Sequence, residues 1–541
     1  MTSRPNGRKP GPLPGSPEAG SPAYALSRTV FVRGLGVIYG IAFLSLAFQV
    51  RGLIGERGIL PLRRFLPLVH DALGATAFFR LPTLLWLAPG DATLVACAWI
   101  GAVLAGLLIA GFAPRPLLAA LWLLYLSLCV AGQVFLQFQW DALLLEAGLI
   151  AIVCAPSGLT PRWREQEPHP MARMLVWWLC FRLMFLSGIT KLLSGDPTWR
   201  DLTALEYHYW TQPIPNPVAW YAAALPAAAQ KASVAVMFVQ EIAAPLLILA
   251  PARFPSARRI ACALLALLQL GIMLTGNYGF FNLLSLLLCI GLLDDRAIRW
   301  LVPGLLRRIG KQPLGAPGDT PEADAPAPRS PEPPPNLVRA SRSVGRRTLL
   351  PAVGAVMIVL GSAAFAREMI ATAGRAVPRW IDALLAPVAP FSSFNGYGLF
   401  RVMTTERPEI IVERSDDGEV WTAVPFRYKP GDVRRPPPVV APYMPRLDWQ
   451  MWFAALDPGT ATGWLLPFLA RLVDGSDPVL GLLHDGAAAA APPRFVRLAL
   501  YRYGFTTPAQ RRADGNWWNR EFEGFLTGSL SREELQRYLA R

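Results

Sequence analysis

The sequence predicts a polytopic α-helical membrane protein of about 8–9 spans with a C-terminal soluble α+β domain. Hydrophobic residues make up 53% of the 541 residues, charged residues only 16%, and long apolar runs recur through much of the chain. Soluble globular chains carry about 25% charged residues, and a helix needs about 20 apolar residues to cross a bilayer. Because this chain lacks the polar surface for several packed soluble domains, most of it should face lipid.

The charge balance and the cysteines exclude several classes of protein. The net charge is +15, which can indicate nucleic-acid binding. Basic loops on the inner side of a membrane account for this positive charge better. We therefore predict that the partner is membrane lipid and that the chain binds no nucleic acid. The six cysteines all lie in apolar runs without a CxxC pair, and the four histidines lack metal-ligand spacing. We therefore expect no disulfide framework, no metal and no other cofactor.

The first part of the chain divides into a tail and a helical domain. Residues 1–27 are rich in Pro, Gly and Ser, which predicts a disordered basic tail. Residues 28–302 form the predicted transmembrane domain. Its first run, from about Thr29 to Val50, is too long for a cleaved signal and should be a retained helix. Further apolar runs lie at about 92–112, 117–138, 141–156, 172–191, 232–251, 258–275, 278–294 and 348–366.

Two of these runs, 141–156 and 278–294, are short, and residues 59–80 should form an amphipathic piece at the membrane interface. With the N-terminus inside, most loop arginines fall inside, as the positive-inside rule requires, and only the loop 51–90 deviates. Residues 303–347 are a proline-rich cytoplasmic linker, and 348–366 are the last transmembrane helix. An odd number of spans then places the C-terminal α+β domain, residues 367–541, outside the membrane.

The C-terminal domain alternates strand and helix signals. Residues Glu409–Arg414 and Val420–Tyr428 should be strands joined at Asp417-Gly418, since Asp-Gly favours hairpin turns. Alternating apolar residues from Val420 to Tyr428 should form one buried face. Three further elements are predicted, namely the helices Arg446–Leu456 and Gly463–Val473 and the strand Arg494–Tyr503. Ser531 with Glu534 forms a capping box for a last helix.

Four ionisable residues should be embedded in the membrane, where each costs about 2.5–3.5 kcal/mol. They are Asp141, Glu146, Arg182 and Lys191. Asp141 has the alternative of a helix N-cap at the interface, and Lys191 that of a snorkelling anchor. Glu146 and Arg182 lie on helices of opposite direction. The two alternatives for them are a structural ion pair and a substrate or proton site.

Aromatic residues concentrate in three places. The loop from Asp196 to Tyr221 contains His208 among seven aromatic and histidine side chains, which is typical of a membrane-interface belt. In the C-terminal domain two clusters combine tryptophan with charged residues. Such clusters are typical of protein interfaces, with core packing as the alternative. The clusters are Arg446, Asp448, Trp449 and Trp452, then Trp517 and Trp518 with Arg520 and Glu521.

Long strings of the sequence resemble the lipase maturation factor family, over most of the chain from about residue 30. The strings are Phe138–Glu146 (FQWDALLLE), Phe181–Phe185 (FRLMF), Pro197–Leu205 (PTWRDLTAL), Tyr397–Thr404 (YGLFRVMT) and Pro445–Leu456 (PRLDWQMWFAAL). The resemblance implies a multi-span membrane protein that assists the folding and assembly of secreted lipases. In animals this family resides in the endoplasmic reticulum membrane with its C-terminal domain in the lumen.

The proline-rich linker and the ending Leu539-Ala540-Arg541, which lacks a retention signal, look bacterial. A bacterial-type member would lie in the cytoplasmic membrane with a periplasmic C-terminal domain. The resemblance implies secreted client proteins, lipases among them. The residues expected to bind clients are Arg401, Arg446, Asp448, Trp449, Trp452, Trp517 and Trp518.

Two functions from different classes follow. The first is a membrane-tethered maturation factor without covalent chemistry, favoured because no nucleophile elbow, P-loop or HExxH occurs. The second is an integral membrane enzyme acting on a lipid or quinone-like substrate, with Lys191, His208 or Glu146 as acid or base. A weaker resemblance of the membrane core to vitamin K-dependent carboxylases motivates it. The first predicts a sealed helical bundle and the second a deep polar cavity reaching these residues.

Two structural expectations follow from these sites. Glu146 and Arg182 should form an ion pair. The helix with Trp449 and Trp452 should be partly exposed, because Arg446, Asp448 and Gln450 alternate with its aromatic residues and would form a polar rim.

Overall fold

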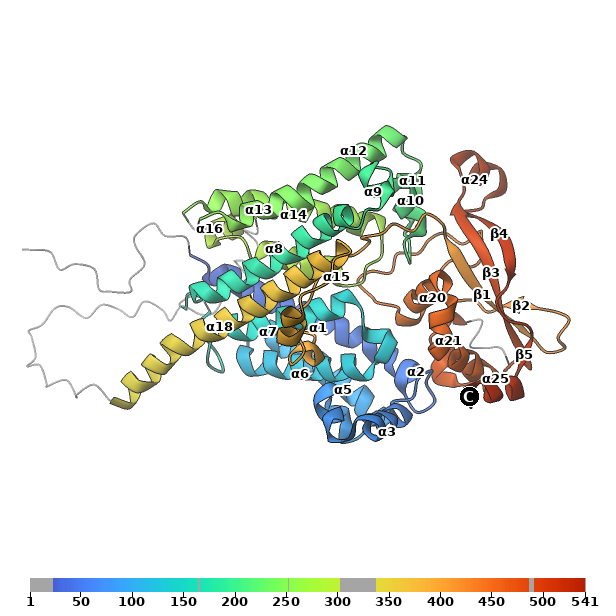
Figure 1. The fold of residues 1–541 in the computed structure, drawn as a ribbon, viewed down its shortest axis with the longest axis horizontal. Coiled ribbons are helices and arrows are strands. Elements are labelled where there is room, and N and C mark those ends of the chain that lie inside the picture. The colour runs from blue at the N-terminus through green and yellow to red at the C-terminus, as the bar shows by residue number, and fades with distance from the viewer. Residues whose placement is uncertain (1–22, 164–165, 252, 302–336, 486–490, 541) are drawn as a thin grey trace, which may run out of the picture.

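The computed structural model describes residues 23–163, 166–251, 253–301, 337–485 and 491–540. Helices make up the chain up to α19 (Arg379–Leu385), and a C-terminal unit with an antiparallel sheet follows (Figure 1). Helices α20 (Arg446–Leu456) and α21 (Pro458–Val473) lie between the helical bundle and the sheet. The predicted disordered tail lies mostly outside the described residues, and α1 (Ala25–Ala47) begins just before the predicted start of the first span.

Seven helices of the described residues are long and apolar enough to cross a membrane. This confirms a polytopic helical membrane protein. The seven are α1, α5 (Asp91–Ala110), α6 (Pro114–Ala131), α8 (Pro170–Leu193), the continuous segment Ala227–Leu249, α14 (Pro255–Thr275) and Leu349–Thr372 within α18 (Leu337–Thr372).

The other two predicted runs form shorter helices, α7 (Gln139–Cys154) and α15 (Phe281–Ile290). Most side chains of α7 are buried against other helices of the bundle. A helix that is apolar on all sides belongs inside a protein as readily as inside lipid. The high hydropathy of α7 therefore reflects packing inside the bundle.

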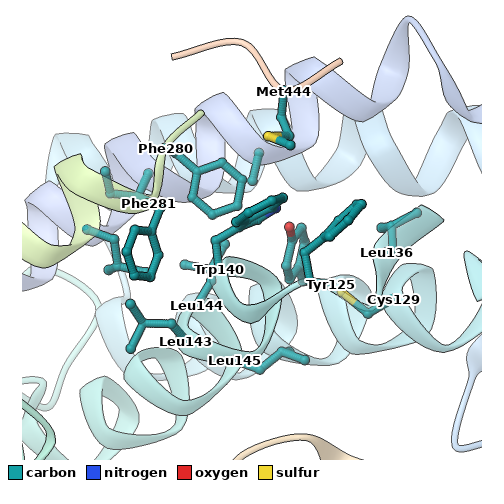
Figure 2. Packing of buried hydrophobic residues seen from close by; sticks show 14 of the residues in the cluster. Tyr125, Cys129, Leu136, Trp140, Leu143, Leu144, Leu145, Phe280, Phe281 and Met444 are labelled. Carbon is teal, nitrogen blue, oxygen red and sulfur yellow. The ribbon is translucent and has the colours of Figure 1, made fainter. Parts of the chain in front are cut away.

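The core of the bundle surrounds α7. Helix α1 packs against α5 and α15, α6 against α5 and α7, and α8 against α18. Figure 2 shows Trp140 of α7 among Tyr125, Phe280 and Met444. Met444 comes from the segment that leads into α20, so the C-terminal unit contributes side chains to the core of the bundle.

The boundaries of the last span differ from those predicted. Most of the predicted linker 303–347 lies outside the described residues, but from Leu337 the chain is already helical. Helix α18 ends at Thr372 rather than at residue 366. The arginines near its start come before the apolar run, yet they lie within the helix, because arginine is a good helix former.

The sheet is antiparallel with the order β2-β1-β3-β4, and β5 pairs with β3. This confirms the α+β class, and the helices, capping box and two long strands occur as predicted. The strands are β1 (Pro408–Ser415), β2 (Thr422–Ala423), β3 (Phe495–Phe505), β4 (Trp518–Phe525) and β5 (Leu530–Ser531), and the last helix is α25 (Arg532–Leu539).

The predicted strand Val420–Tyr428 is wrong in length, since only Thr422–Ala423 pair with β1. Pro425 lacks an amide N–H and cannot continue the ladder. Val424 and Phe426 are buried as predicted, whereas Val420 and Thr422 are exposed. Strand β4 was not predicted, because both of its faces are largely exposed and no apolar alternation marks it.

Candidate functional site

An ion pair between distant parts of the chain connects the C-terminal unit to the bundle. Arg446, at the start of α20, donates to Asp141 in the first turn of α7 at 2.5 and 2.7 Å. Tyr125 donates its hydroxyl to the same carboxylate at 2.5 Å, and both charged side chains are almost fully buried. Asp141 is therefore the acceptor of an interdomain ion pair rather than an N-cap.

The predicted pair of Glu146 and Arg182 is present and is also buried. Sequence reasoning missed that a third segment completes it. Tyr397 donates its hydroxyl to Glu146 at 2.6 Å, and the backbone N–H of Asn395 donates to the same oxygen at 3.2 Å. Arg182 in turn donates to the carbonyl of Asn395 at 3.1 Å. The pair thus fixes the chain that leads from α19 to the sheet.

Further buried polar side chains of the bundle bind backbone of the C-terminal segment. The carboxylate of Asp196 accepts from Met403 N–H at 2.5 Å, and Gln49 accepts from Arg446 N–H at 2.8 Å. Asn277 accepts from two successive amides, Val440 and Ala441, at 2.8 and 3.0 Å. Buried polar groups are costly unless they are hydrogen-bonded, so these contacts specify one docking geometry.

The expected exposure of α20 is wrong. Trp449 is only 3% exposed and Trp452 only 7%, and Trp452 donates its indole N–H to Thr211 O at 2.9 Å. Asp448 accepts from the amides of Tyr428 and Lys429 at 2.9 Å each. Burial raises the pKa of Asp448, while these two amides oppose the rise. The polar residues of this helix therefore have buried partners and form no solvent-exposed rim.

The other predicted client-binding residues lie apart from one another. Arg401 is half exposed and pairs with Glu368 at 3.0 Å. Trp518 is buried beneath the guanidinium of Arg407, whose carbon lies 5.3 Å from the ring centroid. Trp517 is partly exposed and stacks with Arg511. These residues do not form one surface with α20.

The aromatic segment 196–221 folds into short helices against the C-terminal unit. They are α9 (Pro197–Arg200), α10 (Ala204–Thr211) and α11 (Pro217–Ala223). Trp199 donates to Phe400 O at 3.0 Å, and Trp220 donates to the hydroxyl of Thr506 at 3.3 Å. Both indoles are buried, so these two side chains serve interdomain packing.

A cavity of about 540 Å³ reaches Lys191 and His208 but not Glu146. Lys191 donates to Glu241 at 2.6 Å and lies 5.2 Å from the ring centroid of Trp199. Glu241 sits in a π-helical turn, η4 (Val239–Ala243), and was missed by sequence reasoning. The signal was available, since Glu241 is an ionisable residue inside the apolar run 232–251. Because a cavity of this volume lies among the helices, the bundle is not sealed.

His208 lines this cavity from α10. Its Nε2 lies 3.0 Å from the hydroxyl of Tyr278. Burial, followed by the charge of Lys191, lowers the pKa of His208 to about 4. The imidazole is therefore neutral near pH 7, and the cavity holds one compensated ion pair and no net charge on its histidine.

The fold and site define a polytopic integral membrane protein whose C-terminal α+β domain is fixed to its helical bundle by buried ion pairs. Residues 26–300 match the family model of the lipase maturation factor transmembrane domain. Residues 393–527 match that of the lipase maturation factor C-terminal domain. The chain belongs to the lipase maturation factor family.

Relatives match nearly the whole chain. Lipase maturation factor 2 of Homo sapiens is 37% identical over 95% of this chain and 84% of its own length. The Gallus gallus protein of the same name is 36% identical over 95% and 83%. Lipase maturation factor 1 of Homo sapiens is 33% identical over 97% and 93%. No solved structure shows a significant match to the chain.

Proposed function

We propose that this protein is a membrane-tethered maturation factor that assists the folding and assembly of secreted proteins such as lipases. The observation that carries the proposal is that both domains of the family are present and that relatives named lipase maturation factors match almost the entire chain. The docked C-terminal unit supports it, because a binding surface held rigidly near a membrane can meet clients as they are secreted.

The geometry of the cavity does not favour the enzyme hypothesis. The cavity brings Lys191 and His208 together, but Glu146 is bound elsewhere by Arg182 and Tyr397. Lys191 is already paired with Glu241, and the lowered pKa of His208 makes it a weak base. The cavity therefore serves ligand binding better than acid–base catalysis.

Because α20 is buried, we place client binding on the outer face of the sheet, which points away from α20 and α21. Phe522 and Phe525 of β4 are 49% and 53% exposed there, and Tyr501 of β3 packs on Phe522. Arg497 lies over both Trp421 and Phe525. We name these five residues the outer-sheet patch. Aromatic residues with arginine are typical of binding hot spots.

The strand order adds a second element to this surface. β4 pairs with β3 along one edge, and its other edge pairs with no strand among the described residues. An extended client segment can add to such an edge through main-chain hydrogen bonds, while exposed side chains supply apolar contact. The charges of Arg520, Glu521 and Glu523 on β4 would limit self-association at the same edge.

Phe522→Ala with Phe525→Ala should weaken client capture by about 30-fold, since loss of a hot spot costs about 2 kcal/mol. The measurement is a pull-down of secreted lipases with the full-length protein in detergent. The full chain is needed because the isolated C-terminal unit would leave Arg446 unpaired. Val439→Ala, at an exposed apolar position outside the patch, is the control. Equal capture by both variants would exclude the outer-sheet patch, and no capture by the wild type would argue against maturation.

We further propose that the C-terminal domain lies outside the membrane. Seven candidate spans are found in the described residues, and the shorter helices α7 and α15 also run from one end of the bundle to the other, since each has one end at the C-terminal domain and the other at the opposite end. Seven spans and these two make an odd number, which places the two ends of the chain on opposite sides. Alkaline phosphatase fused after Arg541 should be active, and a reporter that fluoresces only in the cytoplasm should stay dark there. The opposite pattern would reverse the topology. For a bacterial-type member the membrane is the cytoplasmic one, and for animal relatives the endoplasmic reticulum membrane.

A further inference from the structure

The cavity that reaches Lys191, here called the Lys191 cavity, is lined by both polar and apolar side chains. The polar side chains come from α8, α10, η4, α14 and α15, with Tyr278 just before α15. They include Lys191, His208, Glu241, Gln269, Asn282 and Ser285. Apolar side chains such as Leu183, Met237, Ile272 and Phe400 line the remainder. Its volume of about 540 Å³ is within the range of small-molecule sites, about 300–1,000 Å³.

The lining includes outward-facing residues of two candidate spans. Val236 of α12 (Ala227–Phe238) is 55% exposed and Leu267 of α14 is 62% exposed, and both border the cavity. Helix α12 packs mainly on α10 and η4, and α14 on α15, α11 and the turn after α12. The cavity thus opens sideways between α12 and α14, on the apolar surface that these helices present to lipid.

Two buried polar atoms of the lining residues lack a hydrogen-bond partner among the described residues. They are Ser285 Oγ, on a fully buried side chain, and His208 Nδ1. Most buried polar groups in proteins are hydrogen-bonded, so each exception requires an explanation. The other polar groups are satisfied, with Lys191 paired to Glu241 and Asn282 donating to Gln269 at 2.8 Å. Both side chains line the cavity although neither atom is exposed to it, so a small rotation of the side chain would bring each unpaired atom to a ligand group.

We propose that the Lys191 cavity binds an amphiphile from the bilayer that has an uncharged hydroxyl- or ester-bearing head and a long apolar chain. The head would meet Ser285 and His208, and the chain would leave between α12 and α14. An anionic head fits poorly, because Glu241 already neutralises Lys191 and an additional buried charge would have no partner. The proposal goes beyond client maturation and does not depend on it.

Photolabelling of the full-length protein in lipid nanodiscs tests this site. The probe is a long-chain monoacylglycerol with a diazirine on its chain, compared at about pH 9 with the matching fatty acid, whose carboxyl group is ionised at that pH even in a bilayer. Labelled peptides should map to α8, α12 and α14. The monoacylglycerol should label about tenfold more strongly than the fatty acid, a difference of roughly 1.4 kcal/mol.

Two glycines provide a matched pair of variants. Gly271 lines the cavity and Gly106 lies on α5, and a side chain added at either position meets open space. Gly271→Phe should narrow the mouth and reduce labelling by about tenfold, whereas Gly106→Phe should leave it unchanged. Equal labelling of the two variants, labelled peptides outside these helices, or equal labelling by the fatty acid would overturn the proposal.

Discussion

Arg446→Ala should reduce the yield of folded protein more than any other single substitution in the C-terminal domain. The change leaves the Asp141 carboxylate buried without its partner, which typically costs about 3–5 kcal/mol. It also removes the connection between α20 and α7. We expect a fall of about 10 °C in the melting temperature of the detergent-solubilised protein, with faster proteolysis between α18 and the sheet.

Two comparisons make this expectation specific to the buried pair. Arg502 also forms ion pairs, with Glu521 and Glu523, but these are partly exposed. Such pairs contribute about 0–1 kcal/mol, so Arg502→Ala should change the melting temperature little. Arg446→Met combined with Asp141→Leu should restore part of the loss, because an apolar pair leaves no buried charge. If Arg446→Ala and Arg502→Ala melt alike, the ion pair does not hold the two domains together.

The membrane class could be predicted from sequence because it depends on local composition. The span Asp91–Ala110 is recognisable from its own residues, whatever it packs against. α7 shows the limit of that reasoning, since its apolar residues are buried by neighbouring helices rather than by lipid. Hydropathy alone does not separate these two environments.

The contacts of the candidate site could be predicted less well than the membrane class, because they depend on tertiary structure. Glu146 and Arg182 could be paired from sequence because they lie in successive apolar runs. Arg446 and Asp141 are 305 positions apart, and no periodicity connects them. The same gap explains why α20 was expected to be exposed. Its alternation of charged and aromatic residues is equally typical of a rim and of a helix buried between two domains, and only the partners decide.

The second large effect concerns the Glu146–Arg182 pair. Glu146→Ala and Arg182→Ala should each lower folded yield strongly, with a loss on the order of 3–5 kcal/mol in free energy of unfolding. The double substitution should cost clearly less than the sum, because it removes both charges together. Folded yield and melting temperature in detergent measure all three variants. A double variant that loses the full sum would show that the two side chains do not interact.

Tyr397→Phe separates the ion pair from its third member. Tyr397 donates to Glu146 at 2.6 Å while Arg182 keeps its own contact with the carboxylate. A hydrogen bond to a charged group contributes about 1.5–3 kcal/mol, so this variant should be destabilised less than Glu146→Ala. In the Glu146→Ala background the hydroxyl has lost its acceptor, and Tyr397→Phe should then cost little more. If Tyr397→Phe has the same effect in both backgrounds, Tyr397 acts through packing and not through Glu146, and the segment around Asn395 is held by its backbone contacts alone.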